Sequence, residues 1–127
     1  MSDIGKFQKI KAFAFDVDGV LTDGGILADL NGELYRVFDS KDSMAIRMAV
    51  MKGFRMAIIT GGRSESIRKR FASCGIKAED VYLGSRAKME DFEDFCKRHN
   101  ACYNVTSDHK RRNIICEATV NHKISCV

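Results

Sequence analysis

The sequence predicts an α/β fold of three layers, a Rossmann-like parallel sheet with helices on both faces. Two observations lead to this class. Short apolar runs of strand length alternate with segments of helical periodicity. The apolar runs show no regular polar alternation, which is typical of strands that are buried on both faces. At 127 residues, 45% of them hydrophobic, the chain is long enough for one domain with one core.

The first two strands are expected over residues 10–15 and 56–59, each followed by a polar turn that contains glycine. Between them, Ile46 and Val50 mark the apolar face of a helix that ends at Gly53. Strand, helix and strand in this order predict a parallel crossover.

The alternation continues towards residue 100. Ser64 is a candidate N-cap for a second helix, which ends before Gly75. A short third strand is expected over residues 81–83, and Phe92 and Phe95 lie on the apolar face of a third helix. We therefore expect residues 1–100 to form the core of the fold.

Residues 24–38 interrupt this alternation. Asn31-Gly32 lies between the apolar pairs at 26–27 and 34–35, a strong signal for a tight β-hairpin. The hairpin follows the first strand directly, so we expect it to be a flap beside any site at the end of that strand. It is too small to exclude water alone, and this favours a homo-oligomer in which another subunit helps.

The composition limits the classes of partner. No apolar run approaches the roughly 20 residues of a membrane span, and the N-terminus lacks the apolar centre of a signal peptide. We therefore expect a cytoplasmic protein without a membrane partner. The formal charge of +4 is too modest and too scattered to predict nucleic-acid binding. Five cysteines without a pairing pattern suit a reducing compartment.

Residues 101–127 have a different character. They hold three of the five cysteines and two of the three histidines, and strand or helix periodicity fades. The spacing of these cysteines and histidines matches no compact zinc pattern. We expect an atypical tail of poorly specified structure rather than a separate domain. Elsewhere, the methionines at 44, 48 and 51 share helical spacing, which favours core packing over a binding surface.

Two acids separated by one residue at the end of the first strand give the strongest functional signal. Asp16 and Asp18 can hold a cation such as Mg²⁺, or divide nucleophile and proton-transfer roles in phosphoryl transfer. Thr60 offers a hydroxyl and a backbone N–H to a phosphoryl oxygen, and Lys88 offers a positive charge. A calcium loop is excluded because its glycine and glutamate positions hold Leu21 and Leu27.

The expected reaction uses both acids in turn. Asp16 would attack phosphorus and form an aspartyl phosphate. Asp18 would protonate the leaving oxygen and then activate the water that hydrolyses the intermediate. Receiver domains also use aspartate, threonine and lysine, but they carry an acid pair on an earlier strand, and no such pair precedes Asp16.

Three segments, residues 15–24, 58–61 and 84–88, resemble the first three signature motifs of the haloacid dehalogenase (HAD) superfamily of phosphatases. Three further features resemble the small capless branch of the superfamily, which hydrolyses a sugar-acid phosphate in lipopolysaccharide sugar synthesis. They are the exact residues of the first motif, the hairpin in place of a cap, and residues 38–42. The resemblance implies Mg²⁺ as cofactor, a small phosphorylated sugar acid as substrate and a homotetramer.

The resemblance also implies roles for individual residues. Asp16 and Asp18 match catalytic residues that bind the metal, and Thr60, Gly61 and Lys88 match the phosphate-binding set. The implied substrate contacts are a loop from Asp39 to Ser43 and three arginines. In full these are Asp39, Ser40, Lys41, Asp42, Ser43, Arg47, Arg63 and Arg70.

The C-terminal part departs from the superfamily. Its fourth motif, a Gly-Asp-Asp segment that supplies another metal-binding carboxylate, has no match, and the fold is expected to be incomplete there. Asp108 lies near the expected place and is the remaining candidate for a metal ligand. A catalytically impaired or noncatalytic member of the superfamily is therefore the alternative to an active phosphatase.

Overall fold

Three parallel strands form the part of the sheet that carries the predicted site. The computed structural model describes residues 11–99, 101–107 and 114–120. β1 (Ala12–Phe15) pairs in parallel with β4 (Arg55–Ile59), and β4 pairs in parallel with β5 (Val81–Tyr82). The carboxyl ends of all three strands therefore meet at one edge of the sheet, as the sequence predicts.

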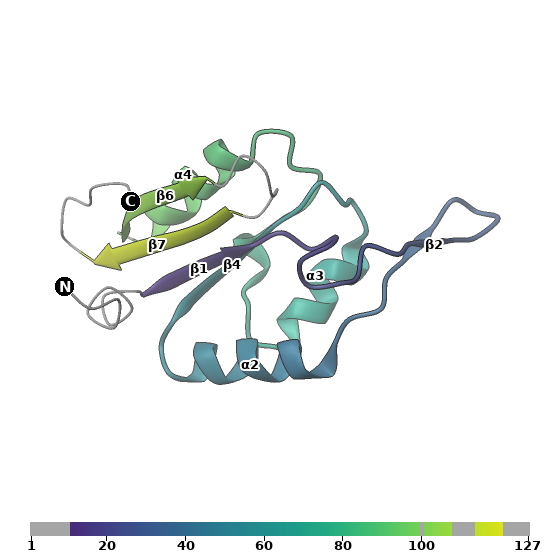
Figure 1. Cartoon of the computed structure of the whole chain (residues 1–127), viewed down its shortest axis with the longest axis horizontal. Coiled ribbons are helices and arrows are strands. Elements are labelled where there is room, and N and C mark those ends of the chain that lie inside the picture. The colour runs from purple at the N-terminus through teal and green to yellow at the C-terminus, as the bar shows by residue number, and fades with distance from the viewer. Residues whose placement is uncertain (1–10, 100, 108–113, 121–127) are drawn as a thin grey trace.

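Helices cover both faces of this sheet, which confirms the three-layer prediction (Figure 1). Alternate residues of β4 point to opposite faces, with Met56 and Ile58 on one side and Ala57 and Ile59 on the other. The first face packs against α2 (Ser40–Met51) and α3 (Glu65–Ala72). The second face packs against α4 (Lys88–Arg98).

The helix ends follow the predicted signals. Asp39 is the N-cap of α2, and its carboxylate accepts the N–H groups of Lys41 and Asp42. Ser64 is the N-cap of α3, as the sequence predicts. Gly53 follows α2 with φ 93°, a conformation that side-chain-bearing residues rarely adopt. A 3₁₀ turn, η1 (Ala78–Asp80), precedes β5.

The predicted hairpin is present and projects away from the body of the molecule (Figure 1). β2 (Leu27–Ala28) pairs antiparallel with β3 (Leu34–Tyr35). The carboxylate of Asp29 fixes the turn by accepting hydrogen bonds from the backbone of Asn31 and Glu33 and from the Tyr35 hydroxyl. The Tyr35 hydrogen bond, followed by the one from Glu33, lowers the pKa of Asp29.

The C-terminal segments differ from the sequence-based expectation of poorly specified structure. β6 (Ala101–Ser107) and β7 (Ile114–Val120) pair antiparallel with each other, and β7 adds to the free edge of β1. The strand order of the resulting five-stranded sheet is β5-β4-β1-β7-β6. Both strands contain β-branched residues, which favour this conformation even where no regular alternation is present.

The methionine stripe of α2 is not part of the core, so that prediction is wrong. Met44, Met48 and Met51 are 60%, 52% and 78% exposed. α2 contacts the sheet through the face that carries Ile46, and a helix that lies on one sheet can bury only one of its apolar faces. Within the described part of the chain, no helix has the length and apolar character of a membrane span.

Candidate active site

Asp16 follows the last residue of β1, and its carboxylate has two partners. Lys88 Nζ lies 2.5 Å from Asp16 Oδ2, and the backbone N–H of Val17 donates to Oδ1 at 2.7 Å. Lys88 is the first residue of α4, so the helix that covers one face of the sheet brings its ammonium group to the carboxyl edge. The structure thus joins the predicted nucleophile and the predicted phosphate-binding lysine.

Asp18 has a partner that the sequence reasoning missed. Arg36, just after β3, donates from Nε to Asp18 Oδ1 at 2.7 Å and from Nη2 to Oδ2 at 3.2 Å. The Arg36 side chain is only 3% exposed, whereas that of Asp18 is 34% exposed. This fork-like contact connects the flap to the acid pair.

Gly62 makes room for this arginine. A Cβ atom at position 62 would lie 2.8 Å from Arg36 Nη2, closer than real Cβ contacts allow. Arg36 Nη1 is buried and has no hydrogen-bond partner among the described residues. The arginine therefore pairs its charge with Asp18 and keeps one unused N–H donor, on Nη1, beside the acid pair.

Thr60 lies at the same edge, directly after β4, but only part of its predicted role is available. Its backbone N–H donates to the carbonyl of Tyr82 at 3.0 Å, so the expected N–H contact with a phosphoryl oxygen is wrong. The reason is that the β4–β5 ladder continues by one residue. The hydroxyl of this fully buried residue accepts the N–H of Gly62 at 3.1 Å and can still donate its own proton.

Gly61 and Arg63 continue this segment, and both are exposed. The Arg63 side chain passes over Gly84, where an added Cβ would lie 3.4 Å from Arg63 Cγ. Gly84 follows β5 and donates its N–H to the carbonyl of Gly62 at 2.8 Å. Arg63 is therefore an exposed residue near the carboxyl edge, with its side chain along Gly84.

The five residues Asp39 to Ser43 do not form the expected loop. Asp39 caps α2 and the next four residues are its first turn, because the Asp39 carboxylate provides the acceptor that starts the helix. Asp39, Ser40 and Asp42 line a cavity of about 510 Å³ together with Thr22 and other residues of the turn after β1. Three carboxylates on its lining, those of Asp23, Asp39 and Asp42, can accept hydrogen bonds from hydroxyl groups.

Two of the predicted substrate contacts touch each other. Arg70 Nη2 donates to Ser43 Oγ at 2.5 Å, and Arg70 Nε is buried without a partner among the described residues. Arg70 is therefore held between α3 and α2. Arg47, in contrast, is exposed.

The acid pair offers the hard oxygen ligands that suit Mg²⁺. Mg²⁺ commonly binds through one or two carboxylates and keeps several waters, so Asp16 and Asp18 are a sufficient minimum. Among the described residues, no third acidic, histidine or cysteine side chain joins them. The predicted ligand Asp108 lies outside the described residues.

The fold, with its aspartate pair, threonine and lysine at one sheet edge, is similar to that of HAD-superfamily hydrolases. Among them is a structure described as a putative HAD superfamily (subfamily III A) hydrolase from Legionella pneumophila, with a TM-score of 0.70 and 30% identity over 76% of this chain and 52% of that one. Within the superfamily, the chain resembles the 3-deoxy-D-manno-octulosonate 8-phosphate phosphatases. It is 36% identical over 95 residues to KdsC of Escherichia coli strain K12, covering 75% of this chain and 50% of that protein. It is 37% identical over 93 residues to KdsC of Haemophilus influenzae, covering 73% and 51%.

Solved structures agree with this resemblance. The cobalt-bound phosphatase of Haemophilus influenzae matches with a TM-score of 0.69 and 36% identity, over 74% of this chain and 54% of that one. The Moraxella catarrhalis phosphatase, in complex with magnesium ion, phosphate ion and a KDO molecule, matches with a TM-score of 0.70 and 31% identity, over 78% and 56%. The chain spans about half the length of these relatives. No protein-family model matches it.

Proposed function

We propose that the chain is a cytoplasmic, Mg²⁺-dependent phosphatase of a small sugar-acid phosphate. The single observation that carries this proposal is the pairing of Asp16 with Lys88 and of Asp18 with Arg36 at one sheet edge. Two acids beside two cations provide a nucleophile, a proton-transfer group and positive charge for a phosphoryl dianion. The substrate that the resemblance implies is 3-deoxy-D-manno-octulosonate 8-phosphate.

In the proposed reaction, an oxygen of Asp16 attacks phosphorus while the bond to the sugar oxygen breaks. Asp18 gives a proton to that leaving oxygen, so the sugar departs as an alcohol. Water then attacks the aspartyl phosphate and gives a proton to Asp18, which releases inorganic phosphate and restores both acids. Lys88, Arg36, the Thr60 hydroxyl and Gly61 are the candidates for holding the phosphoryl oxygens.

The metal would be held by the Asp16 carboxylate and by the backbone carbonyl of Asp18. When bound, Mg²⁺ supplies positive charge that reduces repulsion between the nucleophile and the phosphate. For the sugar, the acid-lined cavity at the start of α2 offers acceptors to hydroxyl groups. Arg47 and Arg70, the arginines that the resemblance implies, are the candidates for the sugar carboxylate, and Arg70 contacts Ser43 in the first turn of α2.

We also propose that the working form is a homo-oligomer, a tetramer by resemblance. The flap exposes a row of large apolar side chains, among them Leu27 at 70%, Val37 at 85% and the tip residue Leu30. Apolar surface of this extent is typical of association surfaces. Light scattering on the purified chain measures its mass, and Leu30→Asp is expected to lower the association constant if the flap takes part.

Phosphate release from 3-deoxy-D-manno-octulosonate 8-phosphate, with and without Mg²⁺, tests the activity. Asp16→Asn should reduce it by several orders of magnitude, whereas Glu79→Gln, an exposed acid on η1, should leave it unchanged. Equal release by the parent chain and Asp16→Asn would reject Asp16 as nucleophile. Glucose 6-phosphate as a second substrate measures the preference for a sugar acid.

The alternative is a noncatalytic member of the superfamily. It is favoured by one observation, that no third carboxylate joins the acid pair among the described residues. This alternative predicts a folded chain without turnover under any Mg²⁺ concentration. Stable labelling by acetyl phosphate without release of phosphate would instead indicate a receiver-like phosphoacceptor.

A further inference from the structure

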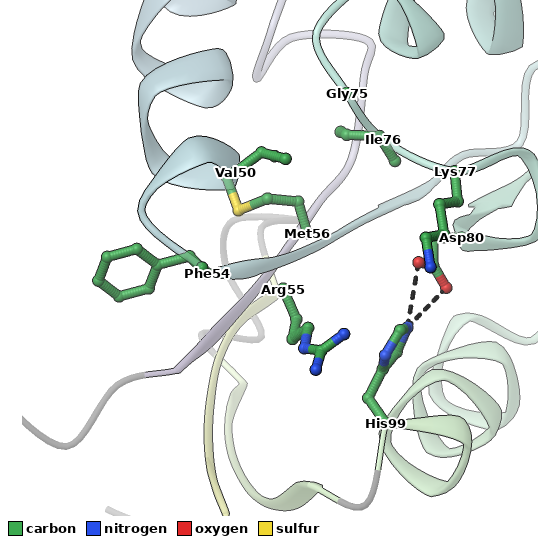
Figure 2. A pocket seen from close by; sticks show the side chains of 10 residues that line it. Val50, Phe54, Arg55, Met56, Gly75, Ile76, Lys77, Asp80 and His99 are labelled. Atoms are coloured by element: carbon green, nitrogen blue, oxygen red, sulfur yellow. Dashed lines mark hydrogen bonds and ion pairs between the residues drawn. The ribbon is translucent and has the colours of Figure 1, made fainter.

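A second cavity lies at the opposite edge of the sheet from the acid pair. It has a volume of about 310 Å³, within the lower range of small-molecule sites. Its lining comes from the end of α2, the start of β4, the segment after α3 and the end of α4 (Figure 2). Arg55 begins β4 and Thr60 follows it, so the two sites are roughly 16 Å apart at about 3.3 Å per strand residue.

One wall of this cavity is apolar. Val50, Phe54, Met56 and Ile76 line it, and Met56 and Ile76 are 6% and 3% exposed. These side chains are held by the core on the α2 and α3 face of the sheet. The wall is therefore preformed and can accept an apolar group without rearrangement.

The other wall carries positive charge. Arg55 and Lys77 both line the cavity, and within residues 11–99 neither cation has a hydrogen-bonded or ion-paired acid. Figure 2 shows their side chains reaching from two different segments towards the part of the cavity where His99 lies. Two cations that have no acid partner within residues 11–99, beside a concave surface, favour an anion.

The one acid on the lining does not neutralise them. The carboxylate of Asp80 forms an ion pair with Arg98, whose Nη2 lies 2.9 Å from Asp80 Oδ1. It also lies 2.9 and 3.0 Å from His99 Nε2 (Figure 2). Arg98 also donates to the carbonyl of Glu79 at 2.7 Å. Asp80 is thus engaged by α4, and its charge is balanced there rather than at Arg55 or Lys77.

We propose that this cavity binds a small organic anion, a carboxylate attached to an aromatic or aliphatic body. The carboxylate lies between Arg55 and Lys77, and the body packs against Val50 and Ile76. This arrangement gives an acid partner to two cations that have none within residues 11–99, and it removes apolar surface from water at the same time. The proposal does not depend on the phosphatase activity, because it uses no residue of the acid pair.

Amide chemical shifts of the ¹⁵N-labelled full chain test the proposal, with 3-phenylpropanoate as the probe. We expect saturable shifts at Gly53, Phe54, Gly75 and Ile76. The neutral amide of the same acid should bind at least about tenfold more weakly, because charge-assisted hydrogen bonds carry the difference. Equal affinity of acid and amide, or no saturable shift at these four residues, overturns the proposal.

Variants separate this cavity from other anion sites. Arg55→Gln with Lys77→Gln should weaken binding of the acid at least about tenfold, and Lys69→Gln, an exposed lysine of α3 outside the lining, should not change it. Should the double variant lose its dispersed spectrum, each single variant is measured instead. Unchanged affinity in the variants, or shifts that occur at Val17 and Thr60 instead, would assign the probe to another site and refute the proposal.

Discussion

Replacing Arg36 by methionine tests whether the flap is fastened to the acid pair. The arginine makes two charge-assisted hydrogen bonds to Asp18, at 2.7 and 3.2 Å, and is itself almost fully buried. Such contacts contribute about 1.5–3 kcal/mol when water is excluded. Because Asp18 is 34% exposed, solvent screening reduces the coupling to about 1–2 kcal/mol.

A double-mutant cycle measures this coupling directly. The parent, Arg36→Met, Asp18→Asn and the double variant are unfolded in urea at one protein concentration, with a chelator present so that no metal contributes. Arg47→Met is the matched control, and its exposed side chain should change the free energy of unfolding by no more than about 0.5 kcal/mol.

The outcome is decisive in both directions. A coupling energy near 1–2 kcal/mol means that the Arg36–Asp18 pair holds the flap beside the acids. A coupling energy below about 0.5 kcal/mol would show that the two side chains act independently, and the reasoning from their geometry would be refuted.

Three further predictions concern the fold itself. Phe71→Ala removes a side chain that is 1% exposed and in edge contact with Phe38, and should lower the free energy of unfolding by about 3–5 kcal/mol in urea titrations. Gly53→Ala places a Cβ in open space but at φ 93°, so calorimetry should detect a loss of about 1–2 kcal/mol from backbone strain alone. Burial raises the pKa of Tyr82 from 10.0 to about 12. The hydrogen bond with Arg98 opposes this shift, and the hydrogen bond with Asp94 adds to it. Because the folded state holds the Tyr82 proton more strongly than the unfolded state, this proton contributes fully to stability below pH about 10, and the contribution is lost between pH about 10 and 12. In Tyr82→Phe, this part of the pH dependence of the free energy of unfolding should disappear.

The sequence was sufficient where local rules decide the structure. Buried strands that end in glycine-containing turns, a serine N-cap at position 64 and the Asn31-Gly32 turn each correspond to one strong local preference. The three parallel strands then bring Asp16, Thr60 and the segment before Lys88 to one edge, because parallel strands share the direction of their carboxyl ends.

The sequence was insufficient where tertiary packing decides between equivalent local choices. α2 has apolar residues on two sides, and only contact with the sheet selects Ile46 over the methionines. Arg36 gave no signal, because an arginine that follows a short strand is usually solvated and its contact with Asp18 spans eighteen positions. The β-branched residues of β7 were a usable signal for a strand, although its place beside β1 required the fold.

The side chains on the sheet face beneath α4 set the distance between this helix and the strands. Three residues of this face are small, Ala12, Ala14 and Ala57, and Phe92 and Phe95 of α4 pack in the same cluster. A larger residue such as leucine at position 57 would displace α4 away from the sheet, and Lys88 in its first turn would move with it. The distance between the Lys88 ammonium group and Asp16 therefore depends on methyl-sized side chains in the core. A substitution there, far from any ligand, can change the position of the positive charge beside a bound phosphate.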